Sequence, residues 1–250
     1  MVHSLGVDIA PRAPISYRMP IASSPPARLP HLGILRFSGA DALSFLQGQI
    51  SNDTQRLTEK FPVFAAYSSA QGRVLALIYL LPHSSGVAAI LPREILQPTL
   101  ERMRKYILRS KVRIEDAGES LIVAGQFGAP PESAPGYVER DGIGMAPVGR
   151  DQNRFWIIGA PDKIDAAVDT AGASVDTAGA SVDAAGAKGF AQAWRLADIH
   201  AGLPQVYAAT SEAFIAQMLN LDLLDGISLD RKSTRLNSSH YALSRMPSSA

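Results

Sequence analysis

The sequence predicts an α+β fold in which helices cover one side of a mostly antiparallel sheet. Three observations predict it: two segments with the spacing of amphipathic helices, apolar strand-like runs around them, and turn residues between consecutive strands. From residue 32 to 125 the expected order is strand, helix, strand pair, strand, helix, strand, which is typical of an α+β layer. A chain of 250 residues can hold one large domain or two small ones.

The first predicted strand and helix follow each other directly. Residues 33–37 form a short strand, and residues 38–41 supply a cap for the next helix. The helix is expected to reach residue 50, because its apolar side chains have helical spacing. That face consists of Ala42, Leu43, Leu46 and Ile50.

Strands are expected at 63–69, 74–81 and 87–91, with a turn at Gln71-Gly72. Residues 74–81 are almost all apolar, so we expect this strand to be buried on both faces. The second helix starts with Pro92, which suits a first turn. Its apolar side has helical spacing and consists of Ile95, Leu96, Leu100, Met103 and Ile107. Two more strands are expected at 111–115 and 121–125.

A seven-residue unit repeats three times between residues 168 and 188. Each copy has one valine as its large apolar residue and a glycine that costs about 1 kcal/mol in a helix interior, so we expect a weakly helical linker. Helices are expected at 190–201, ended by Gly202, and at 211–219. Residues 220–228 then lead toward a strand.

These elements divide the chain into four parts: a disordered arm (1–31), an α+β lobe (32–120), a second α+β lobe with the repeat (121–229), and a tail (230–250). The arm has few acids, which suits either an organellar transit peptide or a loose extension of a bacterial cytosolic protein. Its prolines favour the extension, because they disrupt a targeting helix.

Composition excludes several classes of protein. The chain contains no cysteine, which removes disulfides, thiolate metal sites and cysteine nucleophiles. No stretch approaches the 18 uncharged apolar residues of a membrane span. Residues 1–230 carry 20 basic and 23 acidic side chains, and the acid-free tail supplies the remaining four bases. The sequence therefore gives no body-wide electrostatic signal for nucleic acid.

The motifs of common enzymes are missing. None of the five histidines stands at metal-ligand spacing, and neither a serine-hydrolase elbow nor a phosphate-binding glycine loop occurs. What remains is a polar cluster after the first helix, which includes Gln47, Gln49, Asn52 and Asp53. Amides that donate and accept hydrogen bonds suit a flat heterocycle. Alternatively, these residues cap the helix and start a turn.

The same residues resemble those of the YgfZ-type folate-binding proteins, relatives of the aminomethyltransferase (T-protein) of the glycine cleavage system. The similar segments follow one another in order from about residue 32 to 228. They are 45–53, 65–67, 70–75, 105–112, 201–204 and 214–221.

This resemblance implies a tetrahydrofolate-binding accessory protein that assists iron–sulfur cluster assembly or repair, in the bacterial cytosol or alternatively the mitochondrial matrix. Its implied partners are folate and iron–sulfur client or assembly proteins, with no membrane. The implied fold is a cloverleaf with a ferredoxin-like first lobe, a second α+β lobe and a C-terminal β-barrel. Folate-binding candidates are Gln47, Gln49, Asn52, Asp53, Arg73, Lys111 and Asn220, with Arg73 and Lys111 assigned to the glutamate tail.

The sequence departs from the family pattern in two places. The stretch that matches the aspartate-bearing strand of the aminomethyltransferase, residues 72–78, has no carboxylate, so an enzyme of that kind remains only the alternative. The family's Lys-Gly-Cys signature is expected soon after Leu229, where the chain reads Asp230-Arg231-Lys232-Ser233. We therefore expect a chain truncated before the signature and the barrel, with residues 230–250 as a non-native tail.

Overall fold

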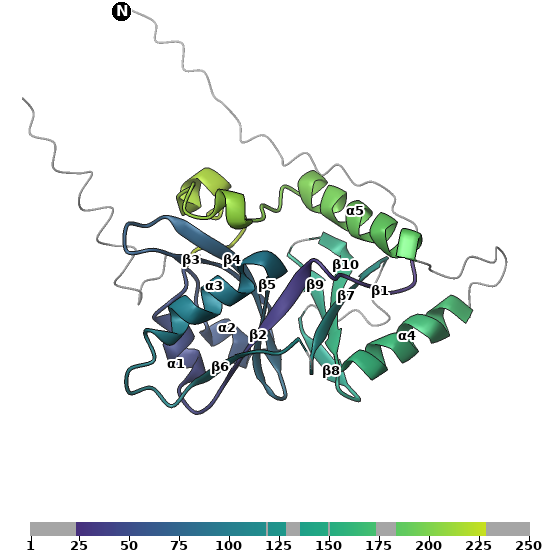
Figure 1. Cartoon of the computed structure of the whole chain (residues 1–250), viewed down its shortest axis with the longest axis horizontal. Coiled ribbons are helices and arrows are strands. Elements are labelled where there is room, and N and C mark those ends of the chain that lie inside the picture. The colour runs from purple at the N-terminus through teal and green to yellow at the C-terminus, as the bar shows by residue number, and fades with distance from the viewer. Residues whose placement is uncertain (1–23, 119, 129–135, 150, 174–183, 229–250) are drawn as a thin grey trace, which may run out of the picture.

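The computed structural model describes residues 24–118, 120–128, 136–149, 151–173 and 184–228. Within these residues the chain forms two five-stranded antiparallel sheets with helices on their outer faces (Figure 1). This confirms a mixed fold of helices and antiparallel sheets. None of the described helices is long and apolar enough to cross a membrane.

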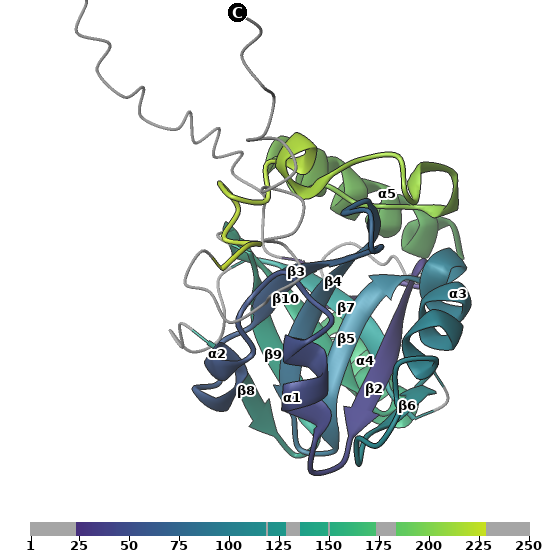
Figure 2. The same ribbon diagram turned by 90° about the vertical axis from the view of Figure 1, so that its left-hand side faces the viewer.

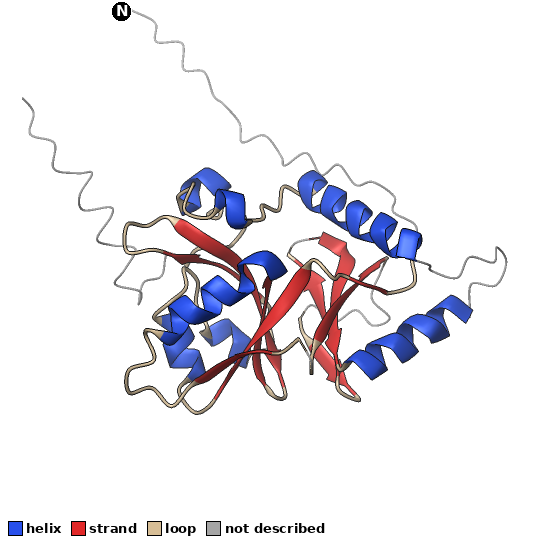
Figure 3. Ribbon diagram, viewed as in Figure 1, coloured by secondary structure: helices blue, strands red, loops and turns tan. Residues whose placement is uncertain are grey.

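The first sheet follows the predicted order of elements. Its strand order is β3-β4-β5-β2-β6, and its outer face carries the helices α1 (Ala42–Gln47), α2 (Gln55–Thr58) and α3 (Arg93–Arg104) (Figure 3). Without the edge strand β3, the chain order is the β-α-β-β-α-β arrangement. The strands are β2 (Leu32–Ser38), β3 (Val63–Ser68), β4 (Val74–His83), β5 (Gly86–Pro92) and β6 (Arg113–Asp116).

The first helix is shorter than predicted. It ends at Gln47, whereas Ile50 forms a bridge with Tyr67 of β3. The next amide, of Ser51, donates to the carbonyl of Ala66 at 2.9 Å. Pairing with a strand therefore takes over the backbone groups that a longer helix would have used.

The second sheet has the order β1-β7-β10-β9-β8. Its strands are β1 (Ala27–Arg28), β7 (Ile122–Phe127), β8 (Val138–Arg140), β9 (Ile143–Val148) and β10 (Asp151–Gly159), and its outer face carries α4 (Pro161–Ala173). β7 agrees with the strand predicted at 121–125, whereas β8, β9, β10 and α4 have no predicted counterpart. The division after residue 120 falls between β6 and β7.

The prediction of a disordered arm is wrong for residues 24–31. β1 pairs with the edge of β7, and the amide of Leu29 donates to the carbonyl of Val123 at 2.9 Å. Ala27 and Leu29 are buried. Apolar contacts with the second sheet thus order a segment whose composition suggests disorder. Residues 1–23, where a transit peptide or an extension was expected, lie outside the described part.

The main core lies between the two sheets. Alternate residues of each strand point inward or outward, as in β4, where Leu77 and Tyr79 face the second sheet and Ala76 and Ile78 face the helices. Both faces of β4 are buried, as its apolar run predicts. The helix α5 (Ala184–His200) and residues 201–228 lie across one edge of this two-sheet core (Figures 1 and 2).

Residues 205–228 return to the first sheet instead of staying with the second. The amide of Val74 donates to the carbonyl of Phe214, and the amide of Glu212 donates back to Val74, both at 2.8 Å. The helix predicted at 211–219 is therefore wrong, because hydrogen bonds to the start of β4 override the local capping signal. The observed 3₁₀ helices are η1 (Ala208–Thr210) and η2 (Ala216–Leu219), and residues 220–228 form turns rather than a strand.

The repeat contributes to two helices. Residues 168–173 belong to α4 and residues 184–188 to α5, so the predicted weakly helical linker is wrong for both ends of the repeat. Residues 174–183 lie outside the described part of the chain. Packing of α4 on β7 and β10, through Ile164, compensates for the glycines.

Candidate ligand site between the two sheets

Asn52 is buried where the first sheet meets the C-terminal segment. Its Nδ2 donates to the carbonyls of Phe64 at 2.9 Å and Asp225 at 2.6 Å, and its Oδ1 accepts the amide of Asp53 at 2.8 Å. These bonds occupy both ends of the side-chain amide. Asn52 therefore fastens Asp225 to β3 and leaves little hydrogen-bonding capacity for a ligand.

The other polar residues of this cluster divide into two kinds. Oε1 of Gln47 accepts hydrogen bonds from the amide and the hydroxyl of Thr54, both at 2.7 Å, and Oδ1 of Asp53 accepts the amide of Gln55 at 2.9 Å. These two side chains shape a turn, which is the alternative that the sequence left open. Gln49 differs, because its buried Oε1 has no hydrogen-bond partner among the described residues.

Arg73, Lys111 and Asn220 do not join the cluster. All three are exposed, and Asn220 ends η2 in the left-handed conformation. Arg73 precedes the first residue of β4, and Lys111 lies beside Gly39, at the end of the sheet where β4 finishes. A ten-residue strand separates those two ends by roughly 30 Å, so the two bases do not form one site.

A cavity of about 150 Å³ opens between the two sheets, next to the residues that Asn52 holds. Phe64 and Tyr79 from the first sheet form one wall, and Pro147 at the end of β9 forms another. Arg56 and Asp225, which form an ion pair, lie at its rim. None of the seven residues predicted from the sequence lines this cavity. Asn52 contributes indirectly, because its hydrogen bonds position Phe64 and Asp225, which do line it.

Four aromatic rings run from this cavity into the core. Phe64 stacks on Tyr79 with ring centroids 4.5 Å apart, Tyr79 contacts Trp156 at 5.5 Å, and Trp156 contacts Trp194 at 5.1 Å. The rings come from β3, β4, β10 and α5, so both sheets and the last long helix contribute. Phe64 and Tyr79 line the cavity and provide flat apolar surfaces on which a planar ring packs, whereas Trp156 and Trp194 are buried behind them.

Three of these rings carry buried polar atoms that have no hydrogen-bond partner among the described residues. These atoms are the hydroxyl of Tyr79 and the indole nitrogens of Trp156 and Trp194. Burial raises the pKa of Tyr79, and the charge of Asp198 raises it further against a lowering by Arg154. The hydroxyl therefore stays protonated, and each of the three groups is a donor. Buried donors normally have partners, which makes this cluster unusual.

A buried ion pair lies beside the rings. Arg154 of β10 has no exposed side-chain surface, and its Nη1 donates to Oδ1 of Asp198 at 2.7 Å and to the carbonyl of Trp194 at 3.2 Å. Its guanidinium also lies 5.0 Å from the centroid of the Trp194 ring. The pair fixes α5 against the second sheet and brings a carboxylate close enough to Tyr79 to raise its pKa.

Five residues of this region were not predicted from the sequence: Tyr79, Arg154, Trp156, Trp194 and Asp198. A signal for two of them was present. Trp194 and Asp198 are four residues apart in the predicted helix 190–201, so they share a face, and a carboxylate there is unusual on the side that carries a tryptophan. Contacts between β4, β10 and α5 depend on the tertiary structure, and no local pattern indicates them.

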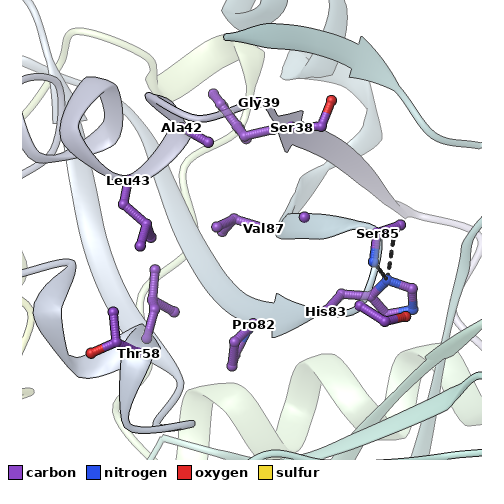
Figure 4. A pocket seen from close by; sticks show the side chains of 13 residues that line it. Ser38, Gly39, Ala42, Leu43, Thr58, Pro82, His83, Ser85 and Val87 are labelled. Carbon is purple, nitrogen blue, oxygen red and sulfur yellow. Dashed lines mark hydrogen bonds between the residues drawn. The ribbon is translucent and has the colours of Figure 1, made fainter. Parts of the chain in front are cut away.

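A second, larger cavity of about 420 Å³ lies between the helices α1 and α2 and the hairpin of β4 and β5 (Figure 4). Leu43, Val87 and Pro82 contribute apolar walls, and His83 and Ser85 lie at one side (Figure 4). None of the seven predicted residues lines this cavity either.

The polar groups of the larger cavity hold the hairpin in place. Ser85 donates its amide to Nδ1 of His83 at 3.1 Å, and its hydroxyl lies 2.7 Å from the same atom. Ser84 binds Glu139 of β8 through its amide at 2.9 Å and through its hydroxyl. Burial lowers the pKa of His83, with Glu139 opposing and Arg36 adding to the shift, so the ring is neutral. The cavity between the sheets is the better candidate for a planar ligand, because the stacked rings of Phe64 and Tyr79 line it.

The geometry therefore defines a mixed α/β protein of two antiparallel sheets, with a cavity between them that is lined by aromatic rings. No protein-family model matches the chain. It is similar to the tRNA-modifying protein YgfZ of several bacteria: 25% identical over 86% of this chain for Pectobacterium carotovorum, 29% over 76% for Klebsiella pneumoniae, and 28% over 87% for Escherichia coli. The resemblance to YgfZ-type proteins is therefore confirmed over most of the chain.

The curated relatives are longer than this chain. The similarity covers 68% of the Pectobacterium protein, 58% of the Klebsiella protein and 68% of the Escherichia protein. Among solved structures, the aminomethyltransferase T of the glycine cleavage system from Bartonella henselae matches with a TM-score of 0.49 and 10% identity. This match covers 57% of this chain and 44% of that one, and it carries no argument about function.

Proposed function

We propose that this chain binds a reduced folate between its two sheets and acts as an accessory factor in tRNA modification. The observation that carries the proposal is the stacked pair of Phe64 and Tyr79 in the wall of the cavity, where the buried Tyr79 hydroxyl has no hydrogen-bond partner among the described residues. A pterin is flat, so it suits the rings, and its ring nitrogens and carbonyl accept hydrogen bonds. The similar bacterial proteins are named tRNA-modifying proteins, which suggests the process.

The residues fit this ligand in a specific way. A cavity of about 150 Å³ is smaller than the roughly 300 Å³ at which pockets for drug-sized ligands begin. It therefore takes the pterin and leaves the rest of the folate outside. Arg56 at the rim would meet the glutamate carboxylates, in place of the Arg73 and Lys111 suggested by the sequence. Phe64 and Tyr79 would contact the ring directly.

Iron–sulfur cluster assembly or repair is the step that the resemblance implies for such a factor, and client or assembly proteins are its proposed partners in the bacterial cytosol. This chain contains no thiolate, so its own residues would contribute by binding folate rather than by ligating a cluster. The enzyme alternative, aminomethyl transfer, receives no support from Asp53, because that carboxylate accepts the amide of Gln55 in a turn.

Titration of the 250-residue chain with tetrahydrofolate tests the proposal. The sequence contains two tryptophans, Trp156 and Trp194, and both belong to the row of rings. Intrinsic tryptophan fluorescence therefore reports on the rings behind the cavity, where Trp156 contacts Tyr79 at 5.5 Å. We expect tetrahydrofolate to quench it, and p-aminobenzoylglutamate, which lacks the pterin, to leave it unchanged. Calorimetry on the same samples gives the affinity.

A matched pair of variants locates the binding. Tyr79→Phe removes one donor and should weaken tetrahydrofolate binding about tenfold, in line with about 1.4 kcal/mol for a hydrogen bond. Tyr67→Phe removes the same atom from a buried tyrosine on the opposite face of the first sheet and should leave the affinity unchanged. Absence of heat and quenching in the unmodified chain, or equal losses in both variants, would contradict the proposal.

A further inference from the structure

The connection between α3 and β6 concentrates positive charge. Residues 102–113 contain six basic side chains and no acidic one, whereas residues 1–230 as a whole carry more acids than bases. We call residues 105–111 the basic loop. It lies on the helix-covered side of the first sheet, away from the site between the sheets (Figure 2).

The loop is anchored at both ends and exposed between them. Ile107 and Val112 pack against the core under α1 and α3, whereas the side chain of Leu108 is 88% exposed. The amides of Tyr106 and Ile107 donate to the carbonyls of Met103 and Arg104 at 3.0 and 3.2 Å. The loop is therefore pre-organised, and ordering it on a partner costs little conformational entropy.

Three of the six bases already have partners. Arg102 faces Glu212 at 3.8 Å, Arg113 binds Glu115 at 2.8 Å, and Arg104 donates to the carbonyl of Ile114 at 2.8 Å. Placement of bases at the carboxyl end of a helix is also expected from the helix dipole. These two explanations account for Arg102 and Arg104, which lie in the last turn of α3.

Lys105, Arg109 and Lys111 are different. All three are exposed, and none forms an ion pair with an acid among the described residues. Arg109 and Lys111 also lie beyond the end of α3, where the dipole is weak. Tyr106, which is 41% exposed, lies between Lys105 and Arg109 in the sequence of the loop. Cations around an exposed aromatic ring form the combination that binds single-stranded nucleic acid, through phosphates and base stacking.

We propose that the basic loop is an RNA-docking surface, on which Lys105, Arg109 and Lys111 bind phosphates and Tyr106 stacks on an unpaired base. The inference rests on the proposed function, because it names the macromolecule on which the accessory factor acts. RNA is favoured over an anionic membrane because the cations occupy one short loop with an aromatic ring, and not the polar face of an amphipathic helix.

Fluorescence anisotropy with labelled bulk tRNA and the full chain tests the inference. At 50 mM salt, we expect a dissociation constant in the micromolar range, typical of sequence-independent binding. Lys105→Gln together with Arg109→Gln should weaken binding about tenfold and reduce the salt slope by about 1.4, since each single-strand phosphate contact contributes about 0.7. Neither substituted residue lines the cavity between the sheets, so folate binding is measured in the same protein.

The matched control carries Arg28→Gln and Lys188→Gln, which remove the same charge from exposed positions near the second sheet. It should keep its tRNA affinity within twofold. Absence of tRNA binding by the unmodified chain, equal losses in both double variants, or tighter binding to phosphatidylglycerol vesicles through the same two residues would overturn the inference. Folate titration separates the two proposals: folate binding without tRNA binding overturns only the docking surface, and the reverse result overturns only the folate site.

Discussion

Trp194 of α5 packs directly on the backbone of Gly125 in β7. A methyl group at Gly125 would lie 2.4 Å from Cζ3 of the indole, closer than atoms can approach. The same glycine stands opposite Trp156 in the pairing of β7 with β10. The absence of a side chain at residue 125 therefore sets how closely α5 and its tryptophan approach the sheet.

Substitution Gly125→Ala should destabilise the chain by about 1–3 kcal/mol, as overpacking of a core does. It should also change the tryptophan emission, because Trp194 must move. Urea unfolding followed by fluorescence measures both effects. Gly189→Ala is the control, since no atom lies within 4 Å of its added methyl group and alanine favours a helix by up to about 1 kcal/mol. Equal destabilisation by the two substitutions would show that the contact is unimportant.

Asn52→Ala should loosen residues 205–228 from the first sheet. The substitution leaves the carbonyls of Phe64 and Asp225 without their donor, which costs about 1–3 kcal/mol for buried groups. Limited proteolysis should then cut this segment earlier than in the unmodified chain. Gln71→Ala, at an exposed turn, should leave the cleavage rate unchanged. Unaltered proteolysis of the Asn52 variant would contradict the prediction that Asn52 holds residues 205–228 on the first sheet.

The buried pair of Arg154 and Asp198 should show strong coupling. Asp198→Leu or Arg154→Met alone leaves one buried charge unpaired and should cost about 3–5 kcal/mol of unfolding free energy. The double variant Arg154→Met with Asp198→Leu should be more stable than either, because neither charge remains. A double-mutant cycle by chemical denaturation measures the coupling. Additive losses would indicate that the two residues act independently.

His31 should make the chain less stable in mild acid. Burial, reinforced by the nearby Arg195, lowers its pKa from 6.5 to about 4. Between these two values the unfolded chain binds a proton that the folded chain does not, so stability falls as the pH falls from 6.5 toward 4. Below pH 4 both states are protonated, and this residue contributes no further change.

The measurement compares unfolding by urea at pH 7 and pH 5 in the unmodified chain and in His31→Gln. The variant does not titrate at this position, so its loss of stability between the two pH values should be smaller. His200→Gln, at an exposed position of α5, is the control and should behave like the unmodified chain. An unchanged pH dependence in the His31 variant would contradict the prediction.

Local patterns predicted the first sheet well. The apolar run that became β4 and the helical spacing from Ile95 to Met103 indicate their own structures, because each element buries a face that its sequence defines. The cluster near Asn52 was also found from the sequence, but its role differs. Its amides mostly bind the backbone, and only Gln49 keeps a buried oxygen without a partner among the described residues.

The sequence by itself determined the α+β class, the order of elements in the first sheet and the resemblance to YgfZ-type proteins, since all three depend on residues that are close in the chain. Tertiary structure alone decided that residues 24–31 join the second sheet, that residues 205–228 return to the first, and that Tyr79, Trp156 and Trp194 meet. Hydrogen bonds and ring contacts between segments distant in sequence produce these arrangements. Such contacts form only when both sheets are in place, so no local spacing of residues encodes them.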